Sequence, residues 1–173
     1  MARRRKHHLP DRVFEGQRCV VSVTICTADR GRWLGEPELA ELVSQEVLRV
    51  HHDHPVLGYC IMPDHIHLIV CNAEAPISRI VGRFKGRISR RVHKTVPELD
   101  LWHHGYWDHI VRRNEGLYEV LRYVLLNPVR KNLVKDWWGY PWLGSPMIGR
   151  VGPDFFGTAS AEEIMWSEIL EIR

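Results

Sequence analysis

The sequence predicts an α+β domain in which an antiparallel sheet carries helices on one face. Short runs rich in β-branched residues alternate along the chain with longer amphipathic stretches, as in strands and helices that share one core. Two strand-like runs are separated only by Pro63 and Asp64, a pair typical of a tight turn. The chain has 173 residues, a length that favours a single domain.

Four strands are expected. The first is rich in β-branched side chains and suits the centre of a sheet. The second and third form an antiparallel hairpin across the Pro63-Asp64 turn, and the fourth is short. These strands cover residues 18–26, 56–62, 65–71 and 107–112.

Three amphipathic helices are expected between and after these strands. Pro37 suits the first turn of one helix, Asn114 is a suitable N-cap of another, and Pro128 ends that last helix. The helices cover residues 36 to about 50, 77–93 and 115–126. The order β-α-β-β-α-β with a further helix is that of a ferredoxin-like split βαβ domain.

The chain divides into three parts. Residues 1–12 are expected to form a basic arm, residues 13–135 the main domain, and residues 136–173 an extension packed on that domain. An aromatic strap would attach the extension, and a helix over residues 160–172 would end it. The strap contains Trp137, Trp138, Tyr140, Pro141 and Trp142.

Positive charge gathers in two segments, although the formal net charge is only +3. The first is the arm, and the second is the helix predicted over residues 77–93, for which a solvated face is the alternative to phosphate contact. The residues expected to contact DNA phosphates are Arg3, Arg4, Arg5, Lys6, Arg83, Lys85, Arg87, Arg90 and Arg91.

Composition excludes a membrane protein, because no apolar run approaches the roughly 20 residues that span a bilayer. No apolar segment follows the basic start either, so no secretory signal is predicted and the cytoplasm is the expected compartment.

His65 and His67 are the sharpest local signal for chemistry. Residues i and i+2 of a strand point to the same face, so the two imidazoles would lie side by side while Ile66 and Leu68 point to the other face. Paired imidazoles suit a divalent transition metal such as Mn²⁺. Two surface histidines on a half-exposed strand are the alternative.

Tyr123 and Asn127 lie four residues apart on a predicted helix and therefore share one of its faces. A tyrosine can act as a nucleophile, and the amide oxygen of an asparagine can ligate a metal. An amphipathic helix with a tyrosine at its edge is the alternative. Trp102, Tyr106 and Trp107 are candidates either to stack on bases or to pack in the core.

Several segments, taken in one order, resemble the HUH-type single-tyrosine transposases, in particular the REP-associated tyrosine transposases of bacteria. The resemblance runs from about residue 13 to about residue 145. The segments are GYCIMPDHIHLIV (residues 58–70), YWDHIVR (residues 106–112), RYVLLNPVRKNLV (residues 122–134) and WGYPW (residues 138–142).

The resemblance implies a role for each matching residue. His65 and His67 match the paired metal ligands, Tyr123 matches the nucleophile, and Asn127 matches the third ligand position. It implies a divalent metal ion, Mg²⁺ or Mn²⁺, and a 5′-phosphotyrosine intermediate on single-stranded or hairpin DNA.

A monomer is favoured, with a dimer as the alternative. Two other functions stay open: a catalytically silent module that binds hairpin DNA, and a ferredoxin-like RNA-binding protein. Asp64 and His109 are candidates for a general base, with a turn residue and a strand-packing residue as their simpler interpretations.

Overall fold

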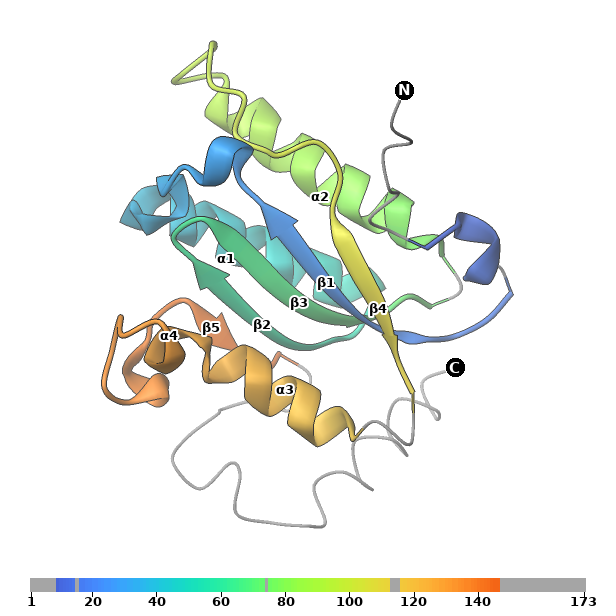
Figure 1. Ribbon diagram of the computed structural model, residues 1–173. Coiled ribbons are helices and arrows are strands. Elements are labelled where there is room, and N and C mark those ends of the chain that lie inside the picture. Colours follow the sequence, from blue (N-terminus) through green and yellow to red (C-terminus); the bar gives the residue numbers. More distant parts are fainter. Residues whose placement is uncertain (1–8, 15, 74, 113–115, 147–173) are drawn as a thin grey trace, which may run out of the picture.

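The protein is built on one five-stranded antiparallel sheet, shown in Figure 1. The computed structural model describes residues 9–14, 16–73, 75–112 and 116–146. The strand order across the sheet is β4-β1-β3-β2-β5. The strands are β1 (Val20–Cys26), β2 (Val56–Met62), β3 (His65–Cys71), β4 (Trp107–Val111) and β5 (Leu143–Gly144). The four predicted strands are therefore confirmed, and β5 is an addition that the sequence did not reveal.

Helices α1 (Pro37–Asp53) and α2 (Ile77–Val92) cover one face of the sheet. Their buried side chains, such as Val47 and Phe84, join the inward side chains of the central strands, including Ile66 and Leu68. This is the ferredoxin-like arrangement that the order of elements predicted. The short 3-10 helices η1 (Asp11–Val13), η2 (Ala28–Arg30), η3 (Trp33–Gly35) and η5 (Trp137–Gly139) lie in the connections.

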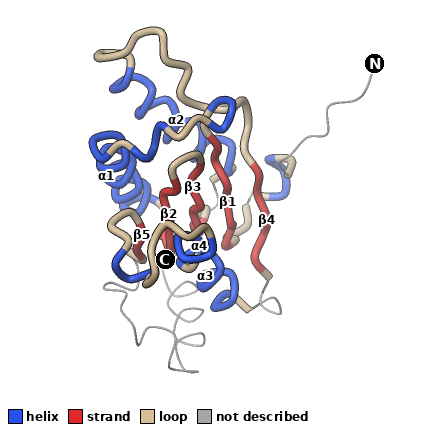
Figure 2. Tube along the Cα trace, turned by 60° about the vertical axis from the view of Figure 1, so that its left-hand side comes forward, coloured by secondary structure: helices blue, strands red, loops and turns tan. Residues whose placement is uncertain are grey.

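Helix α3 (Leu117–Leu125) packs on the opposite face, together with α4 (Asn127–Arg130), as Figures 1 and 2 show. The expectation of helices on one face thus holds for α1 and α2 but not for α3. The reason is its apolar stripe, including Leu121 and Val124, which meets a second set of strand side chains that includes Cys60 and Ile69. Both faces of the sheet are therefore covered, at least in part.

The ends of α3 have simple local causes. Gly116 precedes the helix with φ of +68°, a conformation that suits glycine. Pro128 lacks a backbone N–H and cannot continue the helical hydrogen bonds. Helix α3 therefore ends at Leu125, and a separate short helix, α4, follows. Asn114, the predicted N-cap, lies outside the described residues.

The segment after α4 returns to the sheet and forms its edge. Leu143 pairs with Cys60, and the Tyr140 hydroxyl donates to the Ile61 carbonyl at 2.9 Å. Trp137 is buried, whereas Trp138 is 48% exposed. The helix predicted over residues 160–172 lies outside the described residues.

The N-terminal segment is anchored from residue 9 onward, which lies within the predicted arm. The Leu9 N–H donates to Asp108 Oδ1 at 2.8 Å, and the Ser78 hydroxyl donates to Asp11 Oδ2 at 2.8 Å. Phe14 is fully buried in the core under α1 and α2. Leu9 and Asp11 are therefore held against the domain by hydrogen bonds.

Within the described part of the chain, the structure contains no helix with the length and apolar character that crossing a bilayer requires.

Gly58 sets how closely α3 approaches the sheet. The pairing of β2 with β3 shifts register between Val56 and Gly58, and a Cβ at Gly58 would overlap Leu121 Cδ1. We expect Gly58→Val to lower the free energy of unfolding by about 1–3 kcal/mol, because the added methyl groups push against a fully buried side chain. Denaturant unfolding followed by circular dichroism measures this change.

Gly82 provides the matched control. It lies within α2, and a Cβ there would meet nothing within 4 Å. Gly82→Ala should raise stability by about 0.4–1 kcal/mol, because alanine restricts the unfolded chain more than glycine does. Equal effects of both substitutions would contradict the role assigned to Gly58.

Candidate active site

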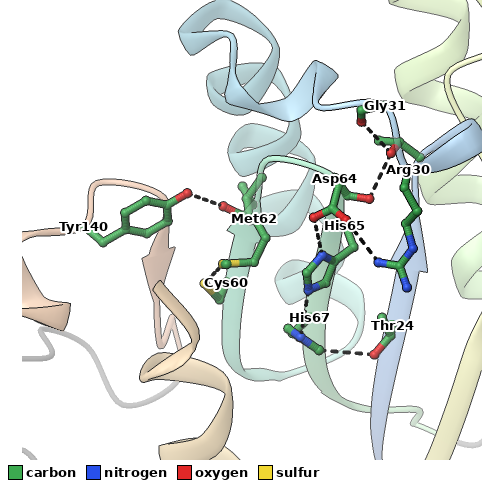
Figure 3. Close-up of polar contacts among 11 residues, drawn as sticks. Thr24, Arg30, Gly31, Cys60, Met62, Asp64, His65, His67 and Tyr140 are labelled. Atoms are coloured by element: carbon green, nitrogen blue, oxygen red, sulfur yellow. Dashed lines mark hydrogen bonds and ion pairs between the residues drawn. The ribbon is translucent and has the colours of Figure 1, made fainter. Parts of the chain in front are cut away.

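The predicted histidine pair lies on the face of β3 that α3 approaches. His65 pairs with Cys26 of β1 and Met62 of β2, while His67 pairs with Thr24 and Cys60. The two Nε2 atoms are 3.1 Å apart, and the imidazole rings meet edge to face (Figure 3). The period of two along a strand thus brings the imidazoles together, as the sequence predicted.

The outer nitrogen of each imidazole has its own partner. His65 Nδ1 lies 2.7 Å from Asp64 Oδ1, so this nitrogen donates to the carboxylate and Nε2 keeps its lone pair. His67 Nδ1 lies 3.1 Å from the Thr24 hydroxyl, which is able to donate or accept. Both rings are therefore held in place with their Nε2 atoms next to each other.

The site favours neutral imidazoles. Burial lowers the pKa of His65, and the charges of Arg30 and Lys131 lower it further, while the hydrogen bond and charge of Asp64 oppose the shift. Burial, with a contribution from His65, lowers the pKa of His67 to about 3. Neutral imidazole is the form that binds metal ions.

Asp64 connects the histidine pair to Arg30. Its Oδ2 lies 3.2 Å from Arg30 Nη1 (Figure 3). Burial would raise the pKa of Asp64, but the hydrogen bond from His65 and the charges of His65 and Arg30 outweigh it, so the pKa is lowered. The carboxylate is therefore ionised and already engaged, which makes it an orienting group for His65.

A strained turn delivers Arg30 to this position. Asp29 and Arg30 have φ of 50° and 56°, values that cost energy for residues other than glycine. The buried Thr27 hydroxyl lies 2.7 Å from the Gly31 carbonyl and 2.9 Å from the Asp64 carbonyl. These contacts tie the turn after β1 to the turn between β2 and β3.

Tyr123 stands beside the pair on α3. Its ring centroid lies 6.1 Å from that of His67, and the side chain is 49% exposed. The guanidinium carbon of Arg130 lies 4.3 Å from the ring centroid, within the range of a cation–π contact. An accessible phenol thus stands between an imidazole and a cation.

Asn127 follows Tyr123 by one turn and is buried, with 4% of its surface exposed. Its Nδ2 donates to the Tyr123 carbonyl at 2.9 Å. The amide nitrogen is therefore occupied at the helix break, and Oδ1 is the atom that remains to act as acceptor or ligand.

The predicted phosphate contacts on α2 lie on the face of the sheet opposite Tyr123. Lys85 Nζ donates to the carbonyls of His103 and Gly105 at 2.8 Å each, and Arg87 pairs with Glu46 at 3.0 Å. Arg83, Arg90 and Arg91 are exposed, and Arg91 also reaches Gln45 at 3.4 Å. Arg3, Arg4, Arg5 and Lys6 lie outside the described residues.

Three cations near the histidine pair were not singled out from the sequence: Arg30, Arg130 and Lys131. Arg130 had no clear signal, because it lies beyond Pro128, where the helix that carries Tyr123 was predicted to have ended. Arg30 had none, because it meets Asp64 only through the tertiary fold. Two other tyrosines lie nearby in the sequence and are less accessible than Tyr123: Tyr106 is buried, and Tyr118 is half-buried on α3.

The chain is similar to known proteins both in sequence and in fold. The model of the family described as IS200-like transposases matches residues 17–125. A Haemophilus influenzae protein assigned as a REP-associated tyrosine transposase is 26% identical, over 50% of this chain and 58% of that protein. A second H. influenzae protein, uncharacterised, is 26% identical over 41% of this chain and 52% of its own length. The chain thus matches less than two thirds of each relative.

A solved structure of a REP-associated tyrosine transposase bound to a REP hairpin is similar in fold. The TM-score is 0.62 at 16% sequence identity, and the likeness covers 83% of this chain and 82% of that one. This likeness confirms the α+β fold with its antiparallel sheet.

The geometry of the pair fits a divalent ion. Bonds of about 2.0–2.1 Å from each imidazole nitrogen to one ion place the two nitrogens about 3 Å apart when they occupy neighbouring positions, and the observed distance is 3.1 Å. Within the described residues, no group of three His, Cys, Asp or Glu side chains gathers. Asn127, predicted as the third ligand, offers an amide oxygen.

This geometry predicts how metal affinity depends on the residues around the pair. We expect Mn²⁺ to bind the protein in isothermal titration calorimetry and His67→Ala to abolish that binding. Asp64→Asn should weaken it about 10- to 100-fold, because His65 loses the carboxylate that orients it.

Asp53→Asn is the matched control for charge, since Asp53 lies at the exposed end of α1 beside His52. It should leave Mn²⁺ affinity unchanged. An Asp64→Asn protein with the affinity of the unmodified protein would contradict the orienting role.

Proposed function

Because the chain belongs to the family of IS200-like transposases, we propose that it cleaves and rejoins single-stranded DNA through a covalent bond to Tyr123. The observation that carries the proposal is the accessible phenol, 6.1 Å from His67 between ring centroids, beside paired imidazoles. The proposed substrate is hairpin or palindromic repeat DNA with an unpaired flank. The transposase whose fold is similar was solved bound to a REP hairpin.

The proposed reaction has two steps, cleavage and rejoining. The Tyr123 oxygen attacks phosphorus as the phenol gives up its proton, and the bond from phosphorus to the 3′-oxygen breaks. The products are a 5′-phosphotyrosine and a 3′-hydroxyl, which takes up a proton. A 3′-hydroxyl then attacks the phosphotyrosine, which rejoins the DNA and releases the phenol. No water or nucleoside triphosphate is consumed.

The residues around Tyr123 suit this reaction. His65 and His67, with Asn127 as third ligand, would hold Mg²⁺ or Mn²⁺, which supplies Lewis-acid activation of the scissile phosphate. Arg130 holds the phenol ring from one side and brings a positive charge beside the attacked phosphate. Arg30 and Lys131 add charge on the His65 side.

One chain provides both the histidine pair and the phenol. This supports the proposal that a monomer is competent for the reaction.

The nucleophile assignment predicts a specific loss. Tyr123→Phe should keep the fold and DNA binding but abolish the covalent adduct with a single-stranded oligonucleotide, because only the attacking oxygen is removed. Denaturing electrophoresis of a labelled oligonucleotide measures the adduct, and mass spectrometry should locate DNA on the peptide that contains Tyr123.

Tyr118→Phe on the same helix is the control and should form the adduct normally. Adduct formation by the Tyr123→Phe protein would refute the assignment. An unmodified protein that binds the hairpin but forms no adduct would indicate a silent DNA-binding module. Preference for RNA of the same sequence would indicate an RNA-binding protein.

We also propose that the arm and exposed arginines of α2 contact phosphates without reading bases. Replacing Arg3, Arg4, Arg5 and Lys6 by glutamine should weaken binding to all DNA sequences alike. The slope of log affinity against log salt should fall by about 0.7–0.9 per lost contact.

Two double variants of α2 compare its exposed arginines with its cations that are paired within the protein. Arg83 and Arg90 are exposed, so their replacement by glutamine should reduce the slope as the arm variant does. Lys85 and Arg87 have partners within the protein, so their replacement should act mainly on stability. A loss confined to one DNA sequence at unchanged slope would count against phosphate contact.

A further inference from the structure

A row of side chains leads across the sheet from the histidine pair to the edge formed by β4. Thr24 pairs with His67 on one side and with Trp107 of β4 on the other. Directly opposed residues of antiparallel strands point to the same face, so Trp107 lies on the face that carries His67 and Tyr123. Ser22 and His109 form the next row, between Ile69 and the edge. We call Ser22, Thr24, Trp107 and His109, together with His103 next to Trp107, the β1–β4 shelf.

The shelf is the less covered part of this face. Ser22 and Thr24 are only half-buried although β1 has a strand on each side, whereas Val21, Val23 and Ile25 on the other face are fully buried. The cause is the path of α3, whose packing is mainly on β2 and β3. The side chains next to His67 on the β4 side are therefore accessible.

An aromatic pair stands at the outer end of the shelf. The imidazole of His103 stacks on the indole of Trp107, with ring centroids 5.5 Å apart and planes inclined by 22°. His103 is exposed, and Trp107 is half-buried. The pair offers a flat π surface rather than a charged pocket.

Hydrogen bonds to the end of β1, to the turn after it and to α2 hold the loop that carries His103 in place. The His103 N–H donates to the Cys26 carbonyl at 2.9 Å, and the Ala28 N–H donates to the Leu101 carbonyl at 2.9 Å. Lys85, reaching over from α2, donates to the carbonyls of His103 and Gly105. A ring fixed in advance loses little conformational entropy when a ligand stacks on it.

The side chains of the shelf suit a nucleotide as ligand. Trp107 and His103 stack on flat rings, the hydroxyls of Ser22 and Thr24 are able to donate or accept hydrogen bonds, and the shelf contains no carboxylate to repel a phosphodiester. Trp107 lies two strand spacings from His67, about 10 Å. A nucleotide next to the one attacked by Tyr123 would reach it.

Building on the function proposed above, we propose that the β1–β4 shelf binds an unpaired DNA base beside the scissile phosphate, stacked on Trp107 and His103. The base must be unpaired because its face has to leave the DNA stack to meet the rings. The shelf thus gives the protein a way to hold single-stranded DNA that does not depend on phosphate charge.

Two matched strands test this proposal. One is a single strand of about 12 nucleotides of mixed sequence without self-complementarity, and the other has the same phosphates but abasic tetrahydrofuran sugars throughout. Fluorescence anisotropy in EDTA, with all proteins carrying Tyr123→Phe, measures affinity without cleavage. The result therefore stands whether or not Tyr123 forms an adduct.

We expect Trp107→Ala to weaken binding of the base-bearing strand about 5- to 150-fold and to leave the abasic strand unchanged, because one stacking contact is lost. Trp107→Phe should retain most of the affinity. His103→Ala should also weaken binding of the base-bearing strand. Because His103 is an exposed loop residue, this variant provides a test even if Trp107→Ala does not fold. Trp138→Ala, which removes an indole that is 48% exposed elsewhere, is the control and should have no effect.

Three results would overturn the proposal. An equal loss for both strands would give Trp107 a purely structural role. Unchanged affinities in the Trp107 and His103 variants would show that no base stacks there. Equal affinity of the protein without shelf substitutions for the two strands would show that bases contribute nothing to binding.

Discussion

The register of β3 between β1 and β2 is the constraint on which the site depends. In this register His65 and His67 face α3, while Ile66 and Leu68 are buried under α1 and α2. A slip of one residue would exchange the two sets, because side chains alternate along a strand. It would place two imidazoles in an apolar core and two aliphatic side chains beside Tyr123, at a cost that the fold does not tolerate.

Two turns fix this register and at the same time complete the site. The turn between β2 and β3 carries Asp64, whose carboxylate holds His65. The turn after β1 carries Arg30, and the Thr27 hydroxyl joins the two turns through the Asp64 carbonyl. The same contacts that align three strands therefore set the orientation of an imidazole and the position of a guanidinium. A change that loosens either turn would act on fold and site together.

The two faces of the sheet are covered to different extents. The face under α1 and α2 is closed by fully buried aliphatic and aromatic side chains. Among the described residues, α3, α4 and the segment around Trp137 close part of the other face, and Gly58 allows α3 to come close enough to bring Tyr123 to His67. The uncovered remainder, next to Thr24 and Trp107, leaves room on one side of the histidine pair. Positive charge lies on both sides: Arg30, Arg130 and Lys131 lie near the pair, whereas the exposed arginines of α2 lie on the opposite side of the sheet.

The sequence by itself determined what depends on neighbours along the chain. Strand alternation placed His65 and His67 on one face, and the Pro63-Asp64 turn and Pro128 fixed where elements end. Tertiary structure alone decided which face α3 covers, that β5 closes the edge of the sheet, and that Arg30 meets a carboxylate 34 residues away. Local patterns carry the periodicity of an element, but they do not specify which of two apolar surfaces a helix will meet. Only the competition among all buried surfaces of the folded chain settles that choice, and with it the position of Tyr123 beside the histidines.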